Sequence, residues 1–195
     1  MNTIQNSFVD FSLVMPAFNE EENIVPLVER IEKVVSGISS TYEIIIVNNG
    51  SDDSTPFVLE KLLKTCPQLV VLTLTRNFGY DGAIIAGLEN SRGQKIIIMD
   101  GDQQDPPEVI PKFISKSEEG FDIVYGIRSK RTEGWIIAAQ INIFYRLMNK
   151  IVNFDLPRDA GNFGIMTREA VDIINRMPER NKFIRGLRAW SGLSS

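Results

Sequence analysis

The chain contains 195 residues, of which 43% are hydrophobic and 24% are charged, a composition typical of one globular domain with a sizeable core. Its 21 Lys and Arg against 25 Asp and Glu give a net charge of -4, so no basic field covers the domain and nucleic acid is not expected as a partner. The absence of histidine excludes Ser–His and Cys–His nucleophilic catalysis and any histidine metal ligand.

Short apolar runs alternate with longer amphipathic stretches along the chain. The apolar runs predict strands at 11–15, 42–47, 70–74, 95–99 and 122–125. The stretches between them predict helices at 24–35, 55–63, 79–88 and 107–117. Pro26 fits the first turn of a helix that begins near Asn23, and Pro107 fits the opening of the last helix.

This alternation predicts an α/β three-layer sandwich with a mostly parallel central sheet and helices on both of its faces. In such sheets ligands bind beyond the carboxyl ends of the strands. The sequence contains no internal repeat and no linker, so we expect residues 1–195 to form a single domain.

Compartment and membrane association follow from two further features. Cys66 is the only cysteine, which rules out an internal disulfide and favours a structural role in a reducing compartment. The first six residues lack the regions of a signal peptide, and no apolar run approaches the roughly 20 residues that span a bilayer. We therefore expect a cytoplasmic chain that is not itself integral to a membrane.

The most informative motif is Asp100-Gly101-Asp102, which directly follows the apolar run at 95–99. Two carboxylates one residue apart, where a buried strand meets a loop, are hard oxygen ligands suited to Mg²⁺ or Mn²⁺. Taken alone, such a pair is also typical of a solvated acidic turn. Its context here strengthens the metal interpretation, because polar segments follow the neighbouring strands at the same edge of the predicted sheet.

Those polar segments are Pro16-Ala17-Phe18-Asn19-Glu20, Asn48-Asn49-Gly50-Ser51-Asp52-Asp53-Ser54 and Gly126-Ile127-Arg128. The sequence contains neither G-x-G-x-x-G nor G-x-x-x-x-G-K-[ST]. A dinucleotide oxidoreductase and a P-loop NTPase therefore both lose support.

Together these segments resemble glycosyltransferase family 2, the inverting GT-A fold, and within it the transferases that act on polyprenyl phosphates. The stretches Arg76-Asn77-Phe78-Gly79 and Asp105-Pro106-Pro107-Glu108 are near-verbatim matches, as is the later Phe183-Ile184-Arg185-Gly186-Leu187. The resemblance extends over nearly the whole chain. It implies transfer of a sugar from a UDP- or GDP-linked donor to a polyprenyl phosphate, at the cytoplasmic face of a membrane.

The resemblance also implies roles for individual residues. Pro16, Phe18 and Glu20 correspond to the pocket for the donor's base and ribose. Asn49 occupies the position of a family Asp that accepts the N–H of the base; its amide carbonyl can still accept, without charge assistance.

The implied cation site lies at Asp100 and Asp102, with Gly101 and Gln104 beside it on the donor side and Arg128 neutralising phosphate charge. A metal ion held by two carboxylates acts as a Lewis acid that stabilises a departing nucleoside diphosphate. An arginine adds a charge-assisted clamp.

The acceptor side departs from the family pattern. In Asp159-Ala160-Gly161-Asn162-Phe163-Gly164, Asn162 replaces a family Asp and Gly164 replaces an Arg, which leaves Asp159 as the carboxylate with a catalytic role. Asn162 cannot take a proton. A lipid phosphate does not need a base, since its second pKa is about 6, so a site poor in bases is compatible with a phosphate acceptor.

Two features bear on membrane contact. Lys130 and Arg131 form either a solvated charge cluster or, for Arg131, a contact to a lipid phosphate on the acceptor side. Residues 135–151 predict an amphipathic helix, either packed on the core or lying at a membrane surface. The family usually continues past the position of Trp190 into a basic loop and membrane helices, so we expect the chain to be a fragment.

Three alternatives remain open from the sequence. The same fold and donor could serve a saccharide acceptor in polysaccharide assembly. The substitutions at Asn48, Asn49 and Asn162 are also compatible with a non-catalytic module that binds nucleotide sugars. A nucleotidyltransferase shares the carboxylate–metal chemistry but normally has a Gly-rich N-terminal loop, which is absent here.

Overall fold

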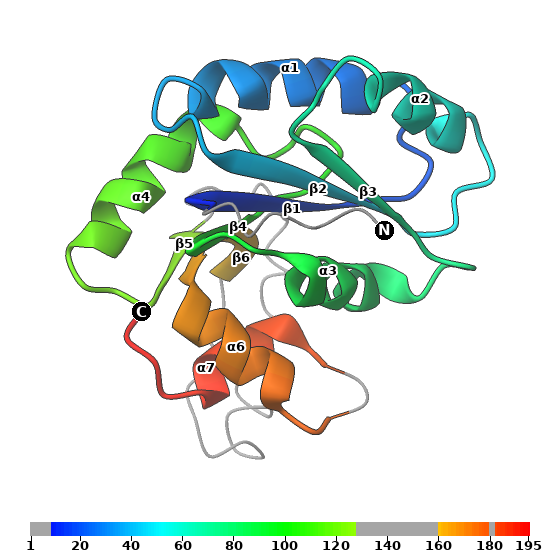
Figure 1. Cartoon of the computed structure of the whole chain (residues 1–195). Helices are drawn as coiled ribbons and strands as arrows, with labels where there is room; N and C mark the ends of the chain where they lie inside the picture. Colours follow the sequence, from blue (N-terminus) through cyan, green and yellow to red (C-terminus); the bar gives the residue numbers. More distant parts are fainter. Residues whose placement is uncertain (1–8, 128–159, 180–181) are drawn as a thin grey trace, which may run out of the picture.

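A computed structural model describes residues 9–127, 160–179 and 182–195. Its centre is a six-stranded sheet in the order β3-β2-β1-β4-β6-β5 (Figure 1). The strands are β1 (Phe11–Ala17), β2 (Tyr42–Asn48), β3 (Leu69–Thr73), β4 (Lys95–Ile98), β5 (Ile123–Ile127) and β6 (Ala160–Thr167). The central position of β1 brings the loops that follow β1, β2 and β4 to one edge of the sheet.

Strands β3, β2, β1 and β4 are parallel to one another, which confirms the mostly parallel sheet. The sequence prediction missed β6, which runs antiparallel to both β4 and β5. In that pairing Ile98 lies opposite Gly164. Asn162, two residues before Gly164 on β6, therefore lies at the same end of the sheet as the loop after β4.

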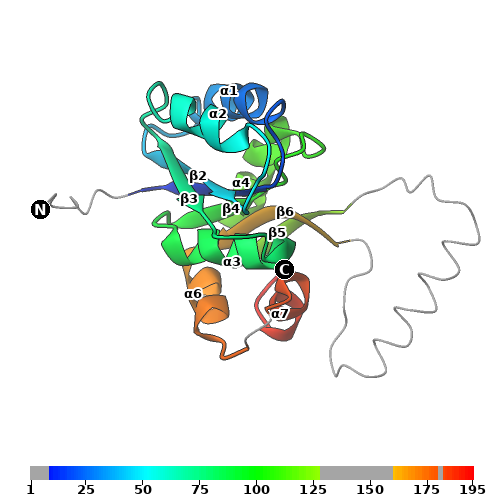
Figure 2. The same cartoon turned by 90° about the vertical axis from the view of Figure 1, so that its right-hand side faces the viewer.

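Helices cover both faces of the sheet, as expected (Figures 1 and 2). One face carries α1 (Ile24–Val35), α2 (Thr55–Leu62) and α4 (Ile110–Glu118), the last preceded by a 3₁₀ turn at Pro107–Val109. The other face carries α3 (Gly79–Asn90), α6 (Arg168–Arg176) and α7 (Ile184–Trp190). None of the helices in the described part of the chain combines the length and apolar character needed to cross a bilayer.

Alternate side chains of the strands supply two apolar cores, one on each face of the sheet. Leu13 and Met15 of β1 pack with α1, whereas Val14 between them packs with α3 and α6. All three are at most 2% exposed. Burial of a side chain of this size stabilises a fold by about 1.5–3 kcal/mol, so the strands are fixed by both cores at once.

The five predicted strands and four predicted helices are confirmed within two residues at each end, when the 3₁₀ turn at Pro107–Val109 is counted with α4. Pro26 lies in the first turn of α1, and Pro107 opens the 3₁₀ turn that leads into α4. The sequence prediction missed α6 and α7 as well as β6.

Cys66 is buried and donates a hydrogen bond from its thiol to Glu32 Oε1 at 3.1 Å. Burial, together with that carboxylate, raises the pKa of the thiol to about 11. The thiolate is therefore disfavoured at neutral pH, which supports the structural interpretation of this cysteine.

Gly164 sits where β6 and β5 approach closely. A Cβ atom at this position would lie 2.3 Å from the carbonyl oxygen of Val124 and 2.8 Å from Cα of Tyr125. Both are backbone atoms that cannot move aside without disturbing the strand pairing. The close packing of β5 on β6 thus requires a glycine at this position.

We predict that Gly164→Ala lowers the free energy of unfolding by about 1–3 kcal/mol, the usual cost of overpacking a close contact. Chemical denaturation monitored by circular dichroism measures this change. Gly37→Ala is the matched control, because the atoms nearest to a Cβ there are the carbonyl oxygens of Val34 at 3.5 Å and Lys33 at 4.0 Å, which are ordinary contacts. Equal stability of the two variants would contradict the role assigned to Gly164.

Candidate functional site

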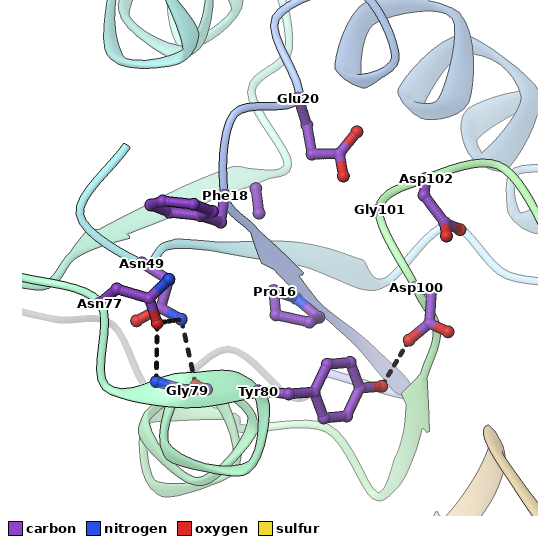
Figure 3. Close-up of a pocket in the computed structure, with 11 residues that line it drawn as sticks. Pro16, Phe18, Glu20, Asn49, Asn77, Gly79, Tyr80, Asp100, Gly101 and Asp102 are labelled. Carbon is purple, nitrogen blue, oxygen red and sulfur yellow. Dashed lines mark hydrogen bonds between the residues drawn. The ribbon is translucent and has the colours of Figure 1, made fainter. Parts of the chain in front are cut away.

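A cavity of about 350 Å³ opens at the carboxyl ends of β1, β2 and β4 (Figure 3). This volume lies within the range of small-molecule sites, about 300–1,000 Å³. Its lining comes from the ends of three strands and the start of α3: Pro16, Ala17, Phe18, Glu20, Asn49, Asn77, Gly79, Tyr80, Asp100, Gly101 and Asp102.

The loop after β1 is fixed by the loop after β2. Asn19 has a φ of 58°, a left-handed conformation that is uncommon for a residue other than glycine. Its side chain donates to Asp52 Oδ1 at 2.6 Å and accepts from the backbone N–H of Asp52, while its own N–H donates to Ser51 Oγ. These bonds hold Phe18 and Glu20, on either side of Asn19, at the cavity.

A second set of hydrogen bonds ties Glu20 to the loop after β4. The amide of Gln103 donates to Asn23 Oδ1 at 3.0 Å, and the amide of Asn23 donates to Glu20 Oε2 at 2.7 Å. Gln103 also has a positive φ, 63°. The metal motif and the predicted ribose pocket are therefore positioned relative to each other by side chains.

Asn49 holds the turn that precedes α3. Its Nδ2 donates to Asn77 Oδ1 at 3.1 Å and to the carbonyl oxygen of Gly79 at 3.0 Å, and its Oδ1 accepts from the N–H of Phe78 at 2.9 Å. Asn49 is only 4% exposed. A carboxylate could not make the two donor contacts, so the asparagine is suited to this position, and its carbonyl keeps one lone pair for a ligand.

Asp100 and Asp102 line the same cavity and project from one loop (Figure 3). Asp100 Oδ1 accepts a hydrogen bond from the Tyr80 hydroxyl at 2.5 Å, and Asp102 Oδ1 accepts from the backbone N–H of Gln104 at 3.0 Å. Each carboxylate therefore has one oxygen engaged by the protein. Gly101 between them packs against the end of β1, since a Cβ there would meet the Pro16 carbonyl oxygen at 2.8 Å.

The donor set fits a hard divalent cation. Within the described residues, the second oxygen of each carboxylate has no hydrogen-bond partner. The same part of the chain holds no group of three or more His, Cys, Asp or Glu side chains that could bind a metal ion. A cation here would thus depend on two carboxylates and on phosphate oxygens of a ligand, the arrangement typical of Mg²⁺ and Mn²⁺.

Tyr80 is largely enclosed, and burial raises the pKa of its hydroxyl well above the usual value, with the Asp100 charge adding to the effect. The hydroxyl therefore stays protonated and donates to Asp100. The positive charge of Arg188 opposes this shift.

Two arginines of α7 converge on Asn162 of β6. Arg185 Nε donates to Asn162 Oδ1 at 3.0 Å, and both terminal nitrogens of Arg188 donate to the Asn162 carbonyl oxygen at 3.3 Å. Arg188 is 7% exposed, and burial lowers its pKa to about 10, so it remains charged at neutral pH. The positive charges of Arg185 and Arg188 therefore lie beside β6, the strand that pairs with β4.

The structure brings most of the predicted donor-side residues to one cavity: Pro16, Phe18, Glu20, Asn49, Asp100, Gly101 and Asp102. Gln104 is exposed and does not line the cavity; its backbone supports Asp102 instead. Arg128, Lys130, Arg131, Asp159 and the predicted helix at 135–151 lie outside the described residues.

Sequence reasoning missed Asn77 and Tyr80 as lining residues. Asn77 belongs to the Arg76-Asn77-Phe78-Gly79 motif, which supports the family resemblance but to which the sequence analysis assigns no role. Tyr80 carries no motif signal, because its contact with Asp100 joins residues 20 positions apart.

Residues 12–174 match the profile of the family described as Glycosyl transferase family 2. The chain belongs to this family. A prophage bactoprenol glucosyl transferase homolog of Escherichia coli K12 is 41% identical over 182 residues, which are 93% of this chain and 60% of the relative. An uncharacterized glycosyltransferase of Synechocystis is 38% identical over 94% of this chain and 58% of its own length. The chain thus spans about 60% of the length of these relatives.

Solved structures support the GT-A fold. A mannosyltransferase of Pyrobaculum calidifontis in complex with GDP-Man and Mn²⁺ has a TM-score of 0.60 at 17% identity, over 85% of this chain and 46% of that one. The glucosyl-3-phosphoglycerate synthase of Mycobacterium tuberculosis in complex with UDP has a TM-score of 0.57 at 20% identity, over 85% and 59%. At these identities the likeness concerns the fold of the family 2 domain.

We predict that Asn49→Asp destabilises the domain by about 1–3 kcal/mol, because the new carboxylate faces two acceptor oxygens that lose their donor. Thermal and urea denaturation measure the effect. Asn77→Asp serves as the control, since it is exposed and keeps the oxygen that accepts from Asn49 and Gly79. If Asn49→Asp proved as stable as Asn77→Asp, the role of the Asn49 amide would be wrong.

Proposed function

We propose that this domain is the catalytic part of a metal-dependent, inverting glycosyltransferase that moves a sugar from a UDP- or GDP-linked donor to a polyprenyl phosphate. The observation that carries the proposal is the position of Asp100 and Asp102 in the same cavity as Phe18, Glu20 and Asn49. This arrangement offers hard ligands for a diphosphate-bound cation beside an aromatic ring and polar groups suited to a nucleoside.

On the donor side, the exposed ring of Phe18 is available to the base, and the remaining lone pair of Asn49 Oδ1 can accept an N–H from it. Glu20, held by Asn23, is placed to accept hydrogen bonds from ribose hydroxyls. Asp100 and Asp102 would hold Mg²⁺ or Mn²⁺ against the diphosphate. The bound cation would supply Lewis-acid stabilisation of the charge on the leaving group.

In the proposed reaction an oxygen of the acceptor phosphate attacks the anomeric carbon from the side opposite the diphosphate. The bond from that carbon to the diphosphate oxygen breaks, the nucleoside diphosphate leaves, and the configuration inverts. The acceptor oxygen is already ionised at neutral pH, so the step requires no proton acceptor. Arg185, at Asn162, would place positive charge on the acceptor side.

The bactoprenol glucosyl transferases among the relatives support a lipid acceptor. One of them, from Shigella phage SfX, is 40% identical over 93% of this chain and 60% of its own length. An enzyme of this kind would work where its lipid resides, so we place the domain at the cytoplasmic face of a membrane. Arg128, Arg131 and Asp159 remain candidates for phosphate and acceptor contacts there.

A saccharide acceptor is the second candidate, with the same fold and donor. Its hydroxyl would need a general base, and Asn162 cannot serve as one. The asparagines at 48, 49 and 162 are the features that favour the third candidate, a binding module without turnover.

We predict that Asp102→Ala weakens Mn²⁺-supported binding of UDP or GDP and lowers glycosyl transfer to a short polyprenyl phosphate by a factor on the order of 10²–10³. Calorimetry measures binding, and a radiolabelled donor measures transfer in the complete protein. Glu60→Ala removes an exposed carboxylate of α2 that is paired with Lys64, and it should change neither.

Undiminished transfer by Asp102→Ala would contradict the metal mechanism. Transfer to a saccharide but not to the polyprenyl phosphate would favour the second candidate. Tight nucleotide binding without any transfer by the complete protein would instead favour the binding module.

A further inference from the structure

Tyr80 makes a contact that none of the roles above uses. It is the second residue of α3, and its hydroxyl reaches across the cavity to Asp100 Oδ1 at 2.5 Å (Figure 3). A tyrosine hydroxyl can donate one hydrogen bond, and this one is given to a carboxylate of the metal motif.

The backbone next to Tyr80 is held by hydrogen bonds, as is its hydroxyl group. Asn49 donates to the carbonyl oxygen of Gly79, and the N–H of Gly79 donates to Asn77 Oδ1. The backbone immediately before Tyr80 is therefore tied to the end of β2. These contacts fix the backbone from which the Tyr80 side chain extends to Asp100.

Asp100 is fixed from a second direction. Its backbone N–H donates to Asp105 Oδ2 at 3.0 Å, and Asp105 is 5% exposed. With the backbone held by Asp105 and Oδ1 held by Tyr80, rotation of the carboxylate about its side-chain bonds is restricted. Within the described residues, Oδ2 of Asp100 makes no hydrogen bond, whereas its Oδ1 and its backbone N–H each make one.

We propose that Tyr80 is a positioning residue of the cation site, which orients Asp100 so that Oδ2 serves the metal ion. The proposal rests on the function proposed above. Hydrogen bonds from outside the ligand set orient metal-binding carboxylates, and removing such a partner typically costs about 10–100-fold in metal affinity or activity. Tyr80 acts through Asp100 and does not touch the substrate in this role.

Tyr80→Phe tests the proposal, because it keeps the ring and removes only the hydroxyl. We expect Mn²⁺ affinity in the presence of UDP, measured by electron paramagnetic resonance titration of the full chain, to fall about 10–100-fold. UDP binding without Mn²⁺ should stay unchanged. Tyr42→Phe is the matched control, because Tyr42 lies at the opposite end of β2 from Asn48, and it should leave Mn²⁺ affinity as it is.

A double-mutant cycle separates positioning from a general loss of structure. If Tyr80 acts through Asp100, then adding Tyr80→Phe to Asp100→Asn weakens Mn²⁺ binding no further than Asp100→Asn alone. Additive losses would overturn the proposal, since a loosened fold weakens binding in either background. Wild-type Mn²⁺ affinity in Tyr80→Phe would overturn it as well.

The same titrations distinguish this inference from the function on which it rests. If Asp100→Asn and Asp102→Ala weaken Mn²⁺ binding and Tyr80→Phe does not, only the role of Tyr80 is wrong. If all three variants bind Mn²⁺ like the wild type, the cation site itself is wrong, and the role of Tyr80 is overturned with it.

Discussion

The site depends on holding two like charges, Asp100 and Asp102, on one short loop. Like charges held close together repel each other. A hydrogen bond to a charged group contributes about 1.5–3 kcal/mol, and Tyr80 and Gln104 each donate one to this pair of carboxylates. The Tyr80 contact also couples the loop after β4 to α3.

That coupling follows from the order of the strands. Because β1 lies between β2 and β4, the loops after all three lie at one edge of the sheet. Beyond the last backbone hydrogen bond, from the N–H of Asn49 to the carbonyl oxygen of Ala17, side chains join them. Asn19 links the first loop to the second, and Asn23 links Glu20 to Gln103. Hydrogen bonds of four amide side chains thus hold the loops around the cavity, namely those of Asn19, Asn23, Asn49 and Gln103. Amides suit this position because each both donates and accepts.

Much of this arrangement could be predicted from sequence, and the exceptions share a physical cause. Apolar runs that end in Pro16 or Asp100 identify strand ends, and the topology of parallel sheets then gathers those residues without any knowledge of distances. Strand β6 was not predicted, because Ala160–Thr167 contains two glycines and few β-branched residues. Its pairing with β4 and β5 makes it a strand. The contact of Tyr80 with Asp100 was not predicted either, because a hydrogen bond between residues far apart in the chain produces no periodic pattern or fixed spacing in the sequence.

For the proposed reaction, the chemistry of the acceptor is constrained by which groups near Asp100 can take a proton. Among the described residues, Asp100 already accepts from Tyr80, Glu20 accepts from Asn23, and Asn162 carries an amide that Arg185 occupies. A hydroxyl nucleophile would need one of them as a general base, and the Asn162 amide cannot serve as one. A phosphate needs none of them, and the positive charge of Arg185 and Arg188 next to Asn162 favours its ionised form. The uncharged amide of Asn162, bound by these two arginines, is compatible with the proposed phosphate acceptor.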